Sequence, residues 1–117
     1  MPVKTREALK TAYKAVDDKF GKDIIMLDIA DLSVLADYFI IATANNLPQL
    51  RIIADEVEGK LTTQGLKLKH AEGYPASRWI LLDFGSIIAH FFLQEEREFY
   101  SIERVWGDAK QILPEEL

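Results

Sequence analysis

The fold is decided by a short run near the middle of the chain, Asp37-Tyr38-Phe39-Ile40-Ile41-Ala42-Thr43. The run is nearly all apolar and rich in branched and aromatic residues, which favour β-strands. A strand with almost no polar position is typical of the centre of a sheet, where both faces are covered. We therefore predict a central strand here, with packed layers above and below it.

An amphipathic helix is expected before this strand, over residues 4–20. Its apolar positions recur at three- and four-residue steps, and they are Leu9, Ala12, Tyr13, Val16 and Phe20. Gly21 is the natural stop. The branched, apolar stretch at residues 23–29, bounded by charge, predicts another strand.

A second helix is expected after the central strand. Asn46 can cap its start, and Pro48 falls in the first turn, where a missing N–H costs little. The helix should run to about Thr63, and Gly65 should end it. One stripe is apolar and should face the core: Leu50, Ile53, Ala54, Val57 and Leu61.

Three further strands are expected in the second half, at residues 66–72 (an edge), 79–84 and 87–93. Gly85-Ser86 supplies a hairpin turn between the last two. The charged tail over residues 94–107 carries spaced aromatic residues and should hold a short helix. This order predicts an α/β (α+β) fold: one domain over residues 1–117, with a mixed sheet of about five strands packed by helices.

Composition limits the function. The chain has 117 residues, 49% hydrophobic and 28% charged, as expected for one soluble domain. Cysteine is absent, which excludes disulfides and thiol chemistry. The net charge of −5 predicts little or no direct nucleic-acid contact and suits a basic protein partner. No apolar run could span a membrane and no signal-peptide core is visible, so we expect a cytoplasmic protein.

Catalytic motifs are missing. No phosphate-binding glycine motif can be written, and the two histidines, His70 and His90, lie in different predicted strands without ligand spacing. We interpret His90 as a strand histidine with one hydrogen-bond partner. No metal or cofactor is predicted.

The alternative is a small metal-dependent nucleotidyltransferase, which would need carboxylates on adjacent strands. The candidates are Asp28, Asp31, Asp37 and Asp83. Such an enzyme also needs a glycine-serine turn before an Asp-x-Asp pair, and Gly85-Ser86 is followed by an apolar strand instead. We therefore interpret these acids as solvated strand ends and caps.

The candidate partner-binding residues lie in the second half. Alternation along residues 79–84 places Trp79, Leu81 and Asp83 on one face, and Tyr100, Glu103 and Trp106 follow in the tail. An aromatic centre with an acidic rim is the usual composition of a patch for a basic partner. The competing interpretation is that Trp79 and Trp106 are ordinary core residues.

Several blocks in the right order resemble the ribosomal silencing factor (Iojap-like) family. They are residues 37–43, Glu72-Gly73 with residues 79–85, and residues 89–92 followed by Arg97, Tyr100 and residues 102–109. The likeness covers about residues 4–110. It departs from the family pattern at Ala44, where glycine is usual, at Pro48, where a basic residue is often found, and at Ser86, where an acid is usual.

The resemblance implies a nucleotidyltransferase-like fold without the catalytic set, and so a protein that is not an enzyme. Family members bind ribosomal protein number fourteen of the large subunit, at the inter-subunit face. There they block joining of the small subunit and lower translation when nutrients are short. Many are homodimers when free. A general dimeric adaptor for another partner is a further alternative.

Overall fold

The computed structural model describes residues 2–73 and 77–117. The helices are α1 (Pro2–Asp18), α2 (Leu47–Thr63), α3 (Gln94–Tyr100), α4 (Ile102–Val105) and the 3-10 turn η1 (Pro114–Glu116). The strands are β1 (Lys22–Asp28), β2 (Tyr38–Ala44), β3 (His70–Glu72), β4 (Trp79–Asp83), β5 (Ile87–Leu93) and β6 (Lys110–Ile112).

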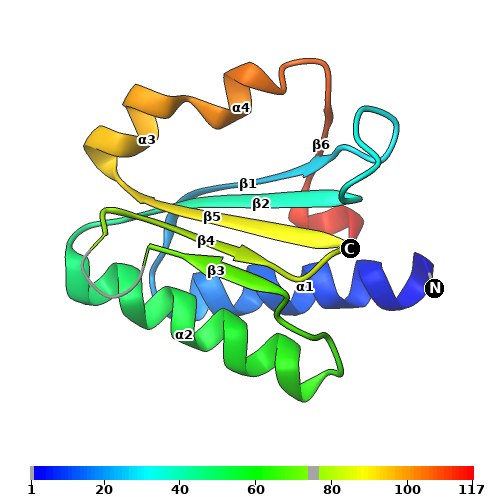
Figure 1. Ribbon diagram of the computed structural model, residues 1–117, viewed down its shortest axis with the longest axis horizontal. Helices are drawn as coiled ribbons and strands as arrows, with labels where there is room; N and C mark the ends of the chain where they lie inside the picture. The colour runs from blue at the N-terminus through cyan, green and yellow to red at the C-terminus, as the bar shows by residue number, and fades with distance from the viewer. Residues whose placement is uncertain (1, 74–76) are drawn as a thin grey trace.

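The described strands form one mixed sheet in the order β3-β4-β5-β2-β1-β6 (Figure 1). The predicted central strand is confirmed, because β2 pairs in parallel with β5 on one side and antiparallel with β1 on the other. All of β2 after Tyr38 is buried. The hairpin predicted at Gly85 is also confirmed, since β4 and β5 are antiparallel and Gly85 adopts φ +86°.

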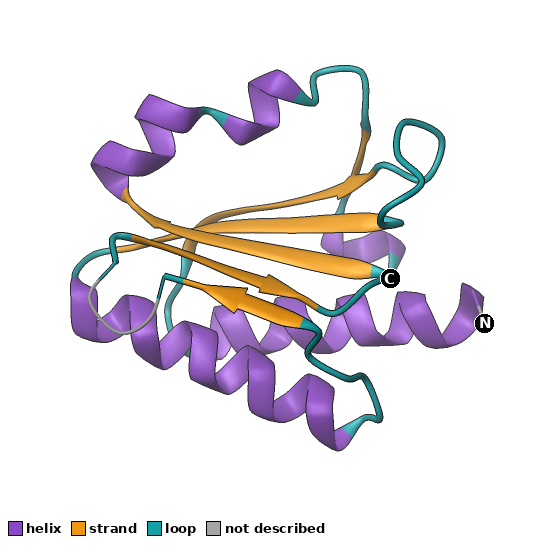
Figure 2. Cartoon of the chain, in the orientation of Figure 1, coloured by secondary structure: helices purple, strands orange, loops and turns teal. Residues whose placement is uncertain are grey.

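The two faces of the sheet are covered differently (Figure 2). Helices α1 and α2 lie side by side across one face, which we call the helix face. The main apolar core fills the space between, with Leu9, Val16, Ile53, Leu82 and Phe91 among its buried members. Residues 94–106 (α3, α4 and Trp106), which we call the arm, lie over the opposite face, the arm face.

Helix α2 follows its sequence prediction. Asn46 caps the N-terminus, because its Oδ1 accepts a hydrogen bond from the Gln49 N–H at 2.8 Å, and Pro48 lies in the first turn. The buried residues of the helix are the five predicted ones: Leu50, Ile53, Ala54, Val57 and Leu61. Gly65 follows the helix with φ +101°, which glycine adopts without a steric cost.

The end of α1 differs from its prediction. The helix ends at Asp18, and Phe20 rather than Gly21 takes the left-handed conformation, with φ +65°. This turn directs the Phe20 side chain outward, so it is 80% exposed and does not join the core. Gly21 is needed for space instead, since a Cβ there would meet Val16 Cγ1 at 2.3 Å.

The sheet edges also differ from prediction. The described sheet has six strands rather than five, because β6 pairs antiparallel with β1 through Ile112 opposite Met26. The edge strand predicted at residues 66–72 is paired as a strand only over β3, while Leu66 and Leu68 pack against the core. The tail holds two short helices, divided at Ser101, rather than one. Among the described residues, none of the helices has the length and hydrophobicity to cross a membrane.

Candidate partner-binding face

Strand β4 directs three of the predicted site residues toward the arm face. Trp79, Leu81 and Asp83 are partly exposed, whereas Ile80 and Leu82 between them are buried against the helices. This is the alternation that the sequence predicts. Leu81 lies opposite His90 in the β4–β5 register, and Asp83 lies opposite Ile88.

The arm brings two more predicted residues to the same face. The Tyr100 ring lies 4.6 Å from the Trp79 ring, measured between centroids, and Tyr100 is still 42% exposed. Trp106 packs edge-on against Phe39 of β2, with ring centroids 5.1 Å apart. Residues distant in sequence therefore converge on one surface.

Three buried rings beneath the surface, those of Phe39, His90 and Phe92, connect the Trp79–Tyr100 contact with the Phe39–Trp106 contact; we call them the floor. His90 lies 4.8 Å from Phe39, 5.9 Å from Trp79 and 6.2 Å from Phe92 between ring centroids. Phe92 stacks on Trp79 at 5.0 Å. We call this continuous set the aromatic face: Phe39, Trp79, His90, Phe92, Tyr100 and Trp106. The two tryptophans are both packing residues and surface residues, since each is partly exposed.

His90 is the polar member of this floor. Trp79 Nε1–H donates to His90 Nδ1 at 3.4 Å, so a neutral ring must carry its hydrogen on Nε2. Nε2 is buried and no hydrogen-bond partner is described for it. Burial lowers the pKa of His90 from 6.5 to about 4, so the centre of the face is uncharged at neutral pH. The prediction of one hydrogen-bond partner is confirmed.

The two predicted acids have different surroundings, and Asp83 alone keeps the predicted position at the rim. Asp83 is at the far end of β4, where its Oδ1 accepts a hydrogen bond from the Gly85 N–H at 2.7 Å. Glu103 turns inward and pairs with Arg97 at 3.1 Å, leaving its side chain 33% exposed. A hollow of about 290 Å³ lies beside Trp79 and Leu81, and Glu72 is part of its lining.

Sequence reasoning omitted four residues that build this site. Phe39, His90 and Phe92 form the floor, and Arg97 anchors the arm. Alternation along residues 87–93 could have placed His90 and Phe92 on one face. The role of Arg97 had no local signal, because its buried partner Thr43 lies 54 positions away in sequence.

The acids of the alternative enzyme hypothesis do not assemble. Across residues 2–73 and 77–117, no group of three or more His, Cys, Asp or Glu side chains is placed to hold a metal ion. Asp28 Oδ1 accepts from the Ala30 N–H at 3.1 Å, and Asp83 Oδ1 accepts from the Gly85 N–H. Both therefore serve local turns, which agrees with the interpretation as strand ends.

Fold and site together define an α+β protein with a six-stranded mixed sheet among its described residues and an aromatic face partly covered by the arm. Residues 2–117 match the family model described as "Ribosomal silencing factor during starvation". The chain therefore belongs to this family of ribosomal silencing factors.

Comparisons with individual proteins agree with this family assignment. The chain is 37% identical to ribosomal silencing factor RsfS of Halalkalibacterium halodurans over 92% of each chain. It is 39% identical to the factor of the same name from Bacillus subtilis, covering 89% of this chain and 88% of the relative. A crystal structure of a protein from Chromobacterium violaceum superposes with a TM-score of 0.84 at 36% identity, covering 87% of this chain and 85% of the other.

Proposed function

We propose that the protein represses translation by binding the large ribosomal subunit through its aromatic face, which then blocks association with the small subunit. The contact is ribosomal protein number fourteen at the inter-subunit face, and the repression operates when nutrients are limiting. Family membership supports a ribosomal target. The protein acts in the cytoplasm, without catalysis and with little nucleic-acid contact, and it forms a homodimer when free.

The aromatic face is the observation that carries this proposal. Partly exposed tryptophan and tyrosine side chains are the residues that most often dominate binding energy at interfaces. Here they surround a neutral centre, while Asp83 and Glu72 lie toward one edge. A surface of this kind suits a partner with an apolar patch bordered by basic side chains.

The charge of the whole chain favours the same class of partner. A net charge of −5 repels phosphate backbones and attracts basic protein surfaces, which raises the rate of encounter. Steric exclusion needs only occupancy and bulk. The described residues extend over 34 × 31 × 26 Å, so a bound copy would keep a second large surface at a distance.

The test is sedimentation of purified ribosomal subunits with and without the protein. We expect it to travel with the large subunit and to reduce the joined-ribosome peak. Tyr100→Ala should weaken both effects, because Tyr100 is 42% exposed beside Trp79. Ile52→Ala is the matched control, since Ile52 is 50% exposed on α2, which covers the helix face.

The outcomes separate the possibilities. If the wild-type protein remains at the top of the gradient and joining is unchanged, the proposal is wrong. If it binds, but Tyr100→Ala and Ile52→Ala are equally impaired, the aromatic face is not the contact surface.

A further inference from the structure

A buried arginine links the arm to the centre of the sheet. Arg97 belongs to α3, and only 5% of its surface is exposed. Its Nη1–H donates to Thr43 Oγ1 at 2.8 Å, and Thr43 is a fully buried residue of β2. With 5% of its surface exposed, Arg97 offers a partner protein almost no area to contact.

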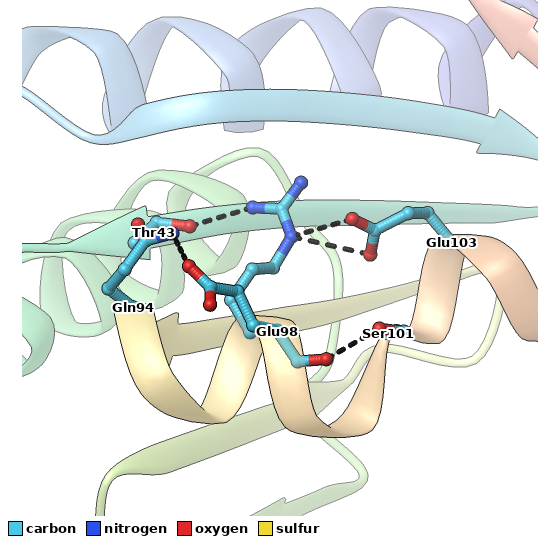
Figure 3. A network of polar contacts seen from close by, with 6 residues as sticks. Thr43, Gln94, Glu98, Ser101 and Glu103 are labelled. Atoms are coloured by element: carbon cyan, nitrogen blue, oxygen red, sulfur yellow. Dashed lines mark hydrogen bonds and ion pairs between the residues drawn. The ribbon is translucent and has the colours of Figure 1, made fainter.

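The same guanidinium also joins the two helices of the arm. Arg97 Nε–H donates to both carboxylate oxygens of Glu103, at 3.1 and 3.3 Å. Figure 3 shows Thr43 on one side of this group and Glu103 on the other. One planar side chain thus connects α3, α4 and β2, a geometry that the point charge of a lysine does not reproduce.

Ring contacts of Tyr100 and Trp106 and an ion pair of Glu96 with Arg78 at 2.7 Å also attach the arm to the sheet, but Arg97 is the one buried residue of α3 and α4. Ser101 breaks the arm with a left-handed conformation, φ +46°, and its hydroxyl donates to the Glu98 carbonyl at 2.6 Å. The outer side chains of the arm are exposed, with Phe99 at 80% and Val105 at 71%. An open hollow of about 420 Å³, lined in part by Arg97 and Glu103, lies between the arm and Asp23 of β1.

We infer that Arg97 is a positioning residue: with Thr43 and Glu103 it holds the arm so that Tyr100 and Trp106 are presented at the aromatic face. The inference rests on the proposed function for its consequence in binding. It also gives Glu103 a different role from the one its sequence pattern predicts. Its carboxylate serves to balance a buried cation, and removing it would leave that cation uncompensated.

The first measurement is hydrogen exchange on the full chain, read separately for the arm and for β2 and β5. In Glu103→Gln we expect arm amides to exchange about tenfold faster while the sheet is unchanged, as in local opening of one segment. Arg97→Met should give the same pattern. A role in overall stability alone would instead speed exchange in every element.

The second measurement is affinity for purified large subunits. Glu95→Gln is the matched control, because it also removes one negative charge from the arm but does not touch the contacts of Arg97. Glu95 is exposed on α3 and lies 3.9 Å from Arg78. Glu103→Gln should weaken binding about tenfold and Glu95→Gln little. Since Arg97 and Glu103 act as a unit, the double variant Arg97→Met/Glu103→Gln should bind no more weakly than either single variant.

The results distinguish this inference from the function it rests on. Unchanged arm exchange in Glu103→Gln overturns the positioning role, and so does a loosened arm with unchanged binding. A double variant that binds more weakly than both single variants means that Glu103 touches the partner itself. If the wild-type protein fails to bind large subunits, the proposed function is wrong, and exchange alone then decides whether Arg97 holds the arm.

Discussion

The two faces of the sheet differ in what they bury. On the helix face, the core between α1, α2 and the strands consists of apolar side chains. Among the described residues, the buried polar or charged ones are Thr43, His90 and Arg97, and all three lie on the arm side of the sheet. The described contacts between aromatic rings lie there as well.

Under the proposed function, this difference separates a face that stabilises the fold from a face that contacts the partner. Burying a charge or an unpaired polar atom costs stability, so such groups need a reason to be retained. His90 Nε2 has no partner described, and Arg97 needs two. Departures from the rules of a good core are expected at functional sites. The predictions below test this assignment of roles.

The largest effect on stability is expected on the helix face. Leu82 is fully buried there, so Leu82→Ala should lower the free energy of unfolding by roughly 3 to 5 kcal/mol through lost burial and the cavity it leaves. Chemical denaturation measures this directly. The fraction that remains folded should bind large subunits as tightly as wild type; weaker binding by that folded fraction would show that the two faces are coupled.

Acid should weaken the arm face through His90. Its folded-state pKa of about 4 lies below the ordinary 6.5, so the unfolded chain takes up the proton first. The stability that the protein gains by burying a neutral His90 is fully present above about pH 6.5. It is lost as the pH falls toward 4, and at pH 5 the free energy of unfolding is lower by about 2 kcal/mol.

His90→Gln cannot titrate and should show a flatter decline between pH 7 and pH 4.5. Denaturation at several pH values, compared between the two proteins, isolates the histidine from the carboxylates that both share. Parallel stability curves would mean that the ring is solvated rather than buried.

Trp79 should affect both stability and binding. Trp79→Ala removes the ring between Phe92 and Tyr100, and we expect a loss of about 2 kcal/mol, less than for a fully buried aromatic residue. Trp79→Phe keeps an apolar ring there but loses the N–H to His90, so it should recover most of the stability. Thermal unfolding and subunit sedimentation check the pair, and a Trp79→Ala protein that fails to fold would place this residue in the core.

The sequence predicts the helix face well because its signals are local. The apolar stripe of α2 and its Asn46 cap follow from residues three or four positions apart, and the structure reproduces them. The features that the sequence does not predict depend on contacts between residues far apart in the chain. Nothing near Ile112 indicates that it pairs with Met26, and nothing near Phe20 shows that the chain turns there before Gly21.

The candidate site divides in the same way. Alternation places Trp79, Leu81 and Asp83 on one face, because a strand has a fixed period of two. It cannot show that Glu103 faces inward, since that depends on Arg97 and on the break at Ser101. The sequence pattern therefore predicts a rim position for Glu103, whereas the structure gives it a buried partner.

The smallest effect on stability is expected at Leu81, the neighbour of Leu82 on the opposite face. Leu81 is only partly exposed to solvent and lies beside the hollow next to Trp79, so Leu81→Ala should cost below about 1 kcal/mol in unfolding free energy. If the arm face is the contact surface, this mild change should nevertheless weaken association with the large subunit about tenfold, as truncation of a central interface side chain does. The two variants should then differ in what they lose: Leu82→Ala loses mainly stability, and Leu81→Ala loses mainly affinity for the large subunit. Equal affinity losses in the folded forms of both variants would mean that the two faces do not divide these roles.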